Sequence, residues 1–433
     1  MSAEELVTAT IHDLSHDGRG IADLSGQRVF VPGALPAEQV LLRSRRRRRK
    51  LQEAELVEIV TPASGRVEPG CSSFGICGGC ALQHLAYAEQ VAFKQRVVEQ
   101  AFARIGRLSP ERWETPITGP QWNYRRRARL GIKFVAAKER VLVGFRERAA
   151  AYITDMRRCP VLAPPMDEAL GELADTVART SIRDRMPQAE FAMGDEYGAL
   201  VLRVLDPPTA DDRGLLEAFG RQHDLDIYLQ PGGPGTVEAL GGEPRALSYS
   251  LADFGLRFEF APTDFVQINA EINARMVGAA IAAAGFESSD RVLDLYCGIG
   301  NFSLPIAQQT AEVLGVEGEA ALVARAARNA AQNGIANARF VAADLMESDW
   351  SFLRERWDVV FLDPARTGAE AAAASMGRML PRRIVYVSCH PGTLARDAAV
   401  LVGTHGYRLS SARILDMFPH THHVEAIAVF DRD

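Results

Sequence analysis

The stretch RVLDLYCGIGNF, residues 291–302, combines an apolar strand, a glycine turn and the start of a helix. Gly298 and Gly300 let a ligand approach the backbone, and the amino end of the helix offers unpaired N–H groups. A second expected strand, residues 312–317, ends in Glu317 about 20 residues further on, where an acid would hold a ribose diol. The turn lacks the longer glycine fingerprint of a pyrophosphate site, so it predicts binding of a nucleoside without phosphates.

Three more strands are expected over residues 338–343, 357–362 and 384–388, and a helix over 270–284. Successive strands carry an acid or a thiol at or near their ends: Asp294, Glu317, Asp344, Asp363 and Cys389. Any single acid could be a helix cap. Because the carboxyl ends of parallel strands meet at one edge of a sheet, five such residues in series predict the rim of one pocket in an α/β fold.

Cys389 follows the β-branched run IVYVS and precedes His390 and Pro391, where the proline prevents the strand from continuing. A lone cysteine is more often a buried structural residue. Its place beside the expected cofactor pocket favours a nucleophile instead. Two last strands, residues 407–415 and 424–430, are expected to form a hairpin that closes the sheet. The histidines between them lack the spacing of zinc ligands and are interpreted as hydrogen-bonding loop residues.

Short β-rich runs alternate with turns over residues 7–60 and predict a small closed β-barrel. The barrel contains the basic run Arg43–Lys50, which favours RNA phosphate binding over a solvated hairpin tip because arginine presents forked donors. A second arginine-rich stretch, residues 122–130, begins a strand-rich region, and its arginines either form salt bridges or contact RNA.

Three thiols lie close together in Cys71, Cys77 and Cys80, joined by glycines that allow tight folding around a centre. Cys159, which is followed by proline, is the expected fourth ligand. Four thiolates suit either zinc or a [4Fe–4S] cluster. The irregular spacing departs from the paired halves of zinc ribbons and favours the iron–sulfur cluster.

A chain of 433 residues is too long for one core. We expect three domains: residues 1–62, the barrel; 63–260, a β-rich central domain with the cluster; and 261–433, the catalytic domain. A helix over residues 88–107 is expected to pack on the catalytic domain. The net charge of −6 argues against general nucleic-acid binding and leaves that role to local basic patches.

The chain has no apolar run of the roughly 20 residues that span a bilayer, and its acidic start lacks the apolar region of a signal peptide. These features predict a cytoplasmic protein without membrane contact. We further expect a monomer.

Several motifs together resemble the S-adenosylmethionine-dependent RNA uracil-C5 methyltransferases. They are Cys-x₅-Cys-Gly-Gly-Cys at 71–80, Asp-Phe-x-Gln-x-Asn at 264–269, Asp-Leu-Tyr-Cys-Gly-x-Gly-Asn-Phe at 294–302, Asp-Pro-x-Arg at 363–366, Ser-Cys-x-Pro-x-Thr-Leu-Ala-Arg-Asp at 388–397 and Phe-Pro-His-Thr-x-His-Val-Glu at 418–425. The resemblance covers nearly the whole chain. With a TRAM-type (OB-like) barrel and four cysteines, the chain is most similar to the branch that methylates uridine in 23S rRNA.

The resemblance implies a Rossmann-like class I methyltransferase domain, with S-adenosyl-L-methionine and a [4Fe–4S] cluster as cofactors and RNA as partner. It implies these cofactor contacts: Gln267, Tyr296, Asn301, Glu317 and Asp344. Asp363 is expected either beside the sulfonium, as a further cofactor contact, or in a hydrogen bond with the target base. It assigns Glu425 as the base. Chemistry independently requires a thiolate to add to C6 of uracil, because C5 is a poor nucleophile, and Cys389 is the candidate. A base must afterwards take the C5 proton.

Two residues beside the nucleophile depart from the family pattern: His390 replaces Asn or Asp, and Gly392 replaces a common Ala. Neither change removes a reacting group. A tRNA uridine-C5 methyltransferase is the same-class alternative, and a non-catalytic iron–sulfur protein that binds RNA or senses redox state is the different-class alternative. DNA cytosine methylation is disfavoured, because those enzymes commonly have proline directly before the nucleophile, where this chain has Ser388.

Overall fold

The computed structural model describes residues 6–24, 26–44, 52–347 and 350–432. The chain divides into two compact units. The first comprises residues 1–97, 145–154 and 418–423, and the second comprises residues 98–144, 155–417 and 424–433. The three domains expected from the sequence stay a prediction.

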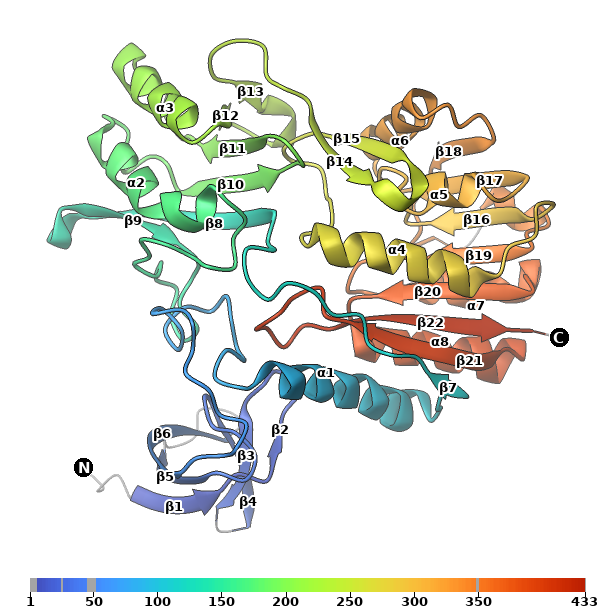
Figure 1. Cartoon of the computed structure of the whole chain (residues 1–433), viewed down its shortest axis with the longest axis horizontal. Coiled ribbons are helices and arrows are strands. Elements are labelled where there is room, and N and C mark those ends of the chain that lie inside the picture. Colours follow the sequence, from blue (N-terminus) through green and yellow to red (C-terminus); the bar gives the residue numbers. More distant parts are fainter. Residues whose placement is uncertain (1–5, 25, 45–51, 348–349, 433) are drawn as a thin grey trace. The chain divides into compact units, whose positions relative to one another are not determined.

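The first unit contains a six-stranded sheet with the strand order β1-β5-β6-β4-β3-β2 (Figure 1). Its strands are β1 (Leu6–Thr10), β2 (Asp13–Leu14), β3 (Gly20–Leu24), β4 (Gln27–Val31), β5 (Gln39–Ser44) and β6 (Gln52–Thr61). Val29, Val40 and Leu42 pack in one apolar core. The β-rich amino-terminal region is therefore confirmed, and closure of the barrel stays a prediction. The sequence interpretation assigned residues 15–20 as a turn and did not predict β2 and β3, the strands on either side of it.

Helix α1 (Tyr87–Ala101) continues into a π-helical turn, η1 (Phe102–Gly106), where one uninterrupted helix was expected. Arg107 ends the turn in the left-handed region, with φ of 54°. The segment Val98–Gly144, which includes η1, belongs to the second unit. There η1 packs on helix α8 (Pro391–His405), and a Cβ on Gly106 would lie 3.0 Å from the carbonyl oxygen of Ala395.

An eight-stranded sheet forms the centre of the second unit, with the order β18-β17-β16-β19-β20-β22-β21-β7. Its strands are β7 (Arg112–Trp113), β16 (Arg291–Leu295), β17 (Glu312–Glu317), β18 (Ala338–Ala342), β19 (Val359–Leu362), β20 (Arg383–Ser388), β21 (Arg408–Leu415) and β22 (Glu425–Asp431). The strands from β18 to β20 are parallel, and β22 is antiparallel to both β20 and β21. The predicted Rossmann-like α/β fold and its closing hairpin are confirmed.

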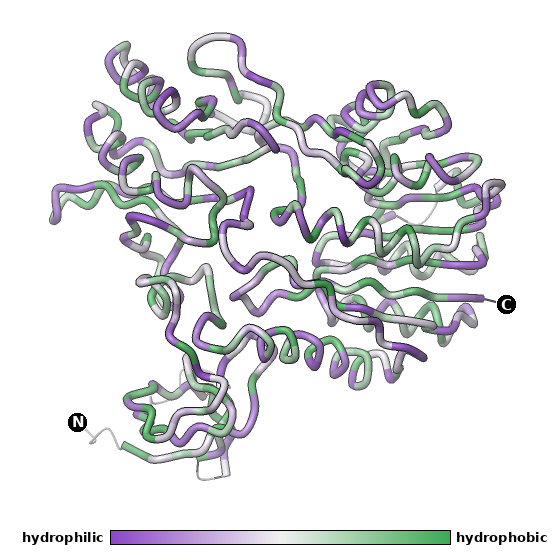
Figure 2. The backbone as a smooth tube through the Cα atoms, in the orientation of Figure 1, coloured by the Kyte–Doolittle hydropathy of each residue, from purple (hydrophilic) through white to green (hydrophobic). Residues whose placement is uncertain are grey.

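Helices cover both faces of this sheet, with α4 and α8 on opposite faces (Figure 1). The helices are α4 (Ala270–Ala284), α5 (Ser303–Ala307), α6 (Ala320–Gln332), α7 (Glu370–Met379) and α8. The bounds of α4 equal the predicted ones because Asn269 caps its start, accepting from the N–H of Ile272 at 3.2 Å, and Gly285 ends it in the left-handed region. Because helices cover both faces of the sheet, the central residues of β19 and β20 are apolar (Figure 2).

A second six-stranded sheet in the same unit has the order β13-β12-β11-β10-β8-β9. Its strands are β8 (Arg127–Val135), β9 (Arg140–Gly144), β10 (Gln188–Met193), β11 (Gly198–Arg203), β12 (Leu225–Gln230) and β13 (Glu238–Ala239). Helices α2 (Met166–Arg179) and α3 (Ala210–Gln222) pack on it, and β14 (Leu247–Leu251) pairs with β15 (Leu256–Phe260) in a separate hairpin. Short 3₁₀ turns are η2 (Ala136–Lys138), η3 (Pro234–Thr236), η4 (Ala252–Phe254) and η5 (Ser351–Arg354).

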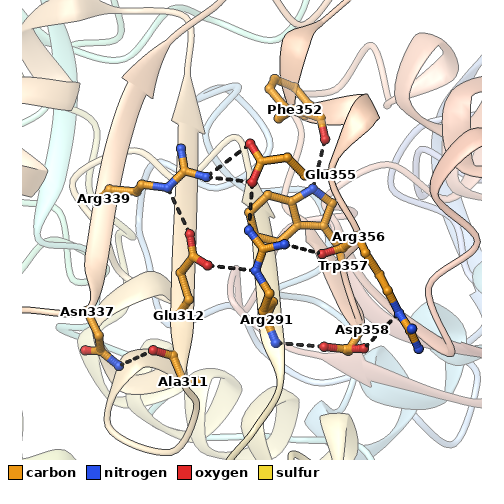
Figure 3. Close-up of polar contacts among 10 residues, drawn as sticks. All are labelled: Arg291, Ala311, Glu312, Asn337, Arg339, Phe352, Glu355, Arg356, Trp357 and Asp358. Atoms are coloured by element: carbon orange, nitrogen blue, oxygen red, sulfur yellow. Dashed lines mark hydrogen bonds and ion pairs between the residues drawn. The ribbon is translucent and has the colours of Figure 1, made fainter.

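A network of ion pairs joins the amino ends of β16, β17 and β18 (Figure 3). Arg291 donates to Glu312 at 2.7 Å and to Glu355 at 2.7 Å, and Arg339 donates to the same two carboxylates at 3.0 and 3.1 Å. The guanidinium of Arg291 also lies 4.6 Å from the ring centre of Trp357. This network links the strands at their amino ends, whereas the expected site residues lie at their carboxyl ends.

Within the part of the chain that the structure describes, no helix combines the length and apolar character needed to cross a bilayer.

Candidate active site

The parallel strands place the predicted residues at one edge of the sheet. In the order β18, β17, β16, β19 and β20, the residues at or just after the strand ends are Asp344, Glu317, Tyr296, Asp363 and Cys389. Along this edge, Asp344, Glu317 and Tyr296 therefore lie on one side of Asp363, and the expected nucleophile Cys389 lies on the other.

Asp294 does not belong to this edge, contrary to the prediction. It lies inside β16, its side chain is fully buried, and its Oδ2 accepts from Ser303 Oγ at 2.5 Å. Burial raises the pKa of this carboxyl to about 7, partly offset by the Ser303 hydrogen bond. Asp294 therefore holds the helix start after the glycine turn from within the core.

The glycine turn between β16 and α5 contains three residues in the left-handed region. Tyr296, Gly298 and Gly300 have φ values of 66°, 55° and 94°. Glu317 Oε2 accepts from the N–H of Gly298 at 3.1 Å, and its Oε1 accepts from that of Gly318 at 2.7 Å. A Cβ on Gly298 would meet no atom within 4 Å, so the backbone there is open to a ligand. This opening beside a fixed carboxylate fits a nucleoside.

The remaining expected cofactor residues differ in how firmly they are held. Asn301 exchanges two hydrogen bonds with Asn273 at 2.9 and 3.1 Å and accepts from Tyr249 Oη at 2.9 Å. Asp344 is exposed, and its Oδ1 accepts from the N–H of Met346 at 2.9 Å. Gln267 is half-buried in the segment between β15 and α4.

The expected nucleophile and base come from neighbouring antiparallel strands. Ser388, the last residue of β20, pairs with Ala426 of β22. Continuing this register by one position sets Cys389 opposite Glu425. Residues 36 positions apart in the sequence thus meet because β22 runs against β20.

The electrostatics of the pair are dominated by burial. Glu425 is 4% exposed, and burial together with the charge of Asp363 raises its pKa to about 8. Its Oε2 has no hydrogen-bond partner among the described residues. Burial also raises the pKa of Asp363 to about 7, and the pKa of the Cys389 thiol to about 11, where Glu425 and Asp363 add to the effect and Arg366 opposes it. Arg366 is therefore the cation that favours the thiolate.

His390 is the N-cap of α8. Its Nδ1 accepts from the N–H of Thr393 at 3.2 Å, at the start of α8. The Ser388 hydroxyl accepts from the N–H of His390 at 3.2 Å. The turn that carries Cys389 is thus tied to both the strand before it and the helix after it.

Three of the four expected cluster ligands lie in the first unit. Gly79 donates its N–H to Cys77 Sγ at 3.3 Å, Cys71 donates its N–H to Gln83 Oε1 at 3.1 Å, and Arg148 donates to the carbonyl of Cys80 at 2.9 Å. Burial raises the pKa of the Cys77 thiol. Cys159 belongs to the second unit, and all four thiols are free of disulfides. Among the described residues, no group of three or more His, Cys, Asp or Glu side chains is arranged to hold a metal ion.

Comparison with known proteins identifies the family. Residues 246–432 match the family model tRNA (Uracil-5-)-methyltransferase. The chain is 50% identical over 98% of its length to the 23S rRNA (uracil(1939)-C(5))-methyltransferase RlmD of Alkalilimnicola ehrlichii, covering 96% of that protein. The chain belongs to the RNA uracil-C5 methyltransferase family. The RlmD of Nitrosococcus oceani is 48% identical, over 99% of this chain and 97% of its own.

A solved member of this family has the same fold. The Pyrococcus abyssi tRNA (uracil-54, C5)-methyltransferase, in complex with S-adenosyl-L-homocysteine, superposes with a TM-score of 0.76 at 25% identity. The match covers 98% of this chain and 100% of that one.

In the present chain, most arginines of the arginine-rich stretch 122–130 form ion pairs with acidic side chains. Arg126 lies 2.6 Å from Asp195, and Arg129 lies 2.9 Å from Glu190, which also lies 3.8 Å from Arg127. Salt bridging, one of the two interpretations, therefore accounts for these three side chains. In the barrel, Arg43 pairs with Glu55 at 3.5 Å, whereas the run from Arg45 to Lys50 lies outside the described residues.

Sequence interpretation missed a buried acid that fixes the loop after Asp363. Asp397 is fully buried in α8, and its Oδ2 accepts from Tyr386 Oη at 2.7 Å and from the N–H of Ala369 at 2.8 Å. Arg396 Nε donates to Oδ1 at 2.8 Å. The available signal was an acid on the apolar side of a helix, where burial requires hydrogen-bond partners.

Proposed function

We propose that this chain transfers the methyl group of S-adenosyl-L-methionine to C5 of a uridine in 23S rRNA. The observation that carries the proposal is the antiparallel pairing of β20 and β22, which sets Cys389 opposite Glu425 beside the strand-end acids. The RNA class is supported by the two RlmD relatives.

Each step of the reaction has a candidate residue in the chain. The Cys389 thiolate adds to C6 of uracil, which makes C5 nucleophilic. Bound S-adenosyl-L-methionine supplies an electrophilic methyl group. Once C5 carries the methyl group, Glu425 takes the C5 proton, and the electrons of that bond re-form the C5–C6 double bond and expel the Cys389 thiolate.

Other residues are proposed to bind and orient the reactants. The cofactor contacts are Gln267, Tyr296, Asn301, Glu317, Asp344 and Asp363. The opening at Gly298 and the backbone-held carboxylate of Glu317 support this assignment. Asp363 lies between the cofactor edge and Cys389, where its charge favours a cationic sulfonium.

We also propose that Cys71, Cys77, Cys80 and Cys159 hold a [4Fe–4S] cluster. Support comes from the chemistry of the donors, which are four cysteine thiols, and from a cation, Arg148, which donates to the carbonyl of Cys80 at 2.9 Å. A Cβ on Gly78 would lie 3.0 Å from the carbonyl oxygen of Arg146, so glycine relieves crowding at this bend of the cysteine loop. Protein purified without oxygen should absorb visible light and contain four irons, whereas colourless protein with zinc would contradict the cluster.

The decisive experiment uses labelled S-adenosyl-L-methionine and RNA from a strain that lacks the gene. Wild-type protein should produce 5-methyluridine, and Cys389→Ala should not, while still binding the cofactor. Full turnover by Cys389→Ala would refute the mechanism. Mapping the modified nucleotide by RNA class separates 23S rRNA from tRNA, the substrate named for the Pyrococcus abyssi enzyme. Failure to bind S-adenosyl-L-methionine would favour a non-catalytic iron–sulfur protein.

Cytoplasmic location and a monomeric state stay predictions.

A further inference from the structure

Residues Phe418–His423 lie between β21 and β22. They belong to the first unit, whereas both strands belong to the second. We refer to these six residues as the 418–423 loop. Glu425 follows the last residue of this loop by two positions and begins β22. The conformation of the 418–423 loop therefore bears directly on the start of the strand that carries the proposed base.

A buried lysine holds the first residue of the loop. Lys94 of α1 is fully buried, and its Nζ donates to the carbonyl oxygen of Phe418 at 2.9 Å. An ammonium group in an apolar interior is unfavourable unless it finds acceptors. The same carbonyl also accepts from Thr421 Oγ1 at 2.9 Å, which closes the loop on itself.

The third residue of the loop is held even more firmly. His420 is buried and has a φ of 66°. Its N–H donates to Gln90 Oε1 at 3.0 Å, and its carbonyl accepts from the N–H groups of Ala81 and Leu82 at 2.8 and 2.9 Å. A left-handed conformation at a non-glycine residue persists only where surrounding contacts impose it.

The two side chains that hold the loop act from one face of one helix. Gln90 and Lys94 are four residues apart in α1, which places them on neighbouring turns of the same side. Gln90 is itself fixed, because its Nε2 donates to the carbonyl of Leu85 at 2.8 Å. The helix thus presents an amide and an ammonium group, both buried, to successive parts of the 418–423 loop.

We infer that Lys94 and Gln90 are positioning residues for Glu425, which they place by fixing the 418–423 loop; the inference rests on the proposed role of Glu425 as proton acceptor. Displacing a catalytic group by about 1 Å can slow a reaction about 100-fold. Ala81 and Leu82 directly follow Cys80, so the cysteine segment contributes to the same anchor.

The inference predicts a specific kinetic defect. A misplaced base slows removal of the C5 proton, so the covalent protein–RNA adduct should persist. General structural damage would instead reduce formation of the adduct together with turnover. The readout is the fraction of protein in a denaturation-resistant adduct, measured beside turnover and binding of S-adenosyl-L-homocysteine.

The test compares Lys94→Met and Gln90→Leu with Glu425→Gln as the reference and Arg96→Met, an exposed site on the same helix, as the control. Both positioning variants should lose about tenfold or more in turnover and accumulate several-fold more adduct than wild type. Arg96→Met should resemble wild type. If Lys94→Met does not fold, Gln90→Leu decides.

Two results would overturn the inference, and they are distinguishable. If Glu425→Gln traps adduct but neither positioning variant does, only the positioning role fails. If Glu425→Gln itself traps no adduct on a competent RNA, the assignment of the base fails, and the positioning role fails with it.

Discussion

A Cβ atom built on Gly392 would lie 3.1 Å from Cε1 of His390 and 3.5 Å from its Nδ1. The first distance is shorter than ordinary van der Waals contact, so an alanine at position 392 would press on the imidazole. The imidazole in turn caps α8 through Thr393. Positions 390 and 392 beside Cys389 are therefore physically coupled, since a Cβ at position 392 would crowd the imidazole that caps the helix.

We predict that Gly392→Ala is tolerated better when His390 is replaced by Asn. In the middle of a helix, Gly→Ala stabilises by about 0.5–1 kcal/mol, and at Gly392, in the first turn of α8, the gain should be at most this large. In the wild-type background, the close contact between the new Cβ and the His390 imidazole should cancel this gain. Asn at position 390 is also a good N-cap, and its smaller side chain should leave room for the alanine methyl group. A double-mutant cycle by urea unfolding should give a coupling of about 0.5 kcal/mol or more. Strict additivity would show that the two sites are independent.

The second prediction concerns Arg366, the cation that lowers the pKa of the Cys389 thiol. Removing its charge in Arg366→Met should leave less thiolate and slow adduct formation by about tenfold, whereas Arg366→Lys should keep most of the rate. Rapid-quench measurement of adduct formation in a Glu425→Gln background isolates this step. Equal rates for the Met and Lys variants would mean that charge is not what Arg366 contributes.

The third prediction concerns pH. Glu425 can accept a proton only when ionised, and burial followed by the charge of Asp363 raises its pKa to about 8. Decay of the adduct in a single turnover should therefore slow about tenfold for each pH unit below that value. Asp363→Asn removes the neighbouring negative charge and should shift the midpoint to lower pH. A decay rate that does not change between about pH 6 and about pH 9 would contradict a raised pKa for the group that accepts the proton.

The fourth prediction concerns stability in acid. Arg291, and secondarily Arg339, lower the pKa of Glu312 below its ordinary value. Since the folded-state pKa is depressed, the stabilisation is present above the unfolded value of about 4.3 and is lost as pH falls through the folded value. Glu312→Gln should lower the free energy of unfolding at neutral pH by about 1 kcal/mol or less, because the pairs are partly exposed. Its stability should also depend less on pH below about 4.3 than that of wild type. Parallel stability curves for the two proteins would contradict this.

Much of the catalytic fold could be predicted because residues close together in the sequence determine it. The strand and glycine turn at residues 291–302 follow from apolar continuity and from glycines that occupy left-handed positions. Helix α4 was predicted from Ala270 to about Ala284, and in the structure Asn269 and Gly285 mark these ends. Strand β7 could not be predicted, because its two residues are a strand only through pairing with β21.

The errors at the site have a common physical cause. A side chain that lies in the core cannot be distinguished by sequence from one at the rim, since both follow an apolar run. Asp294 was therefore expected at the rim and lies buried against Ser303. Lys94 was overlooked for the opposite reason, because a lysine on an amphipathic helix is normally solvent-facing. Its partner, a backbone carbonyl more than 300 residues away, leaves no trace in local sequence.

The antiparallel pairing of β20 and β22 also limits how this chain can change. Side chains alternate between the faces of a strand, so deleting one residue within β22 would turn Glu425 away from Cys389. Substitutions that preserve packing leave this relation intact. The spacing of nucleophile and base is thus set by main-chain hydrogen bonds between the two strands. Most point mutations should leave this spacing unchanged, whereas a single insertion or deletion in β22 should alter it.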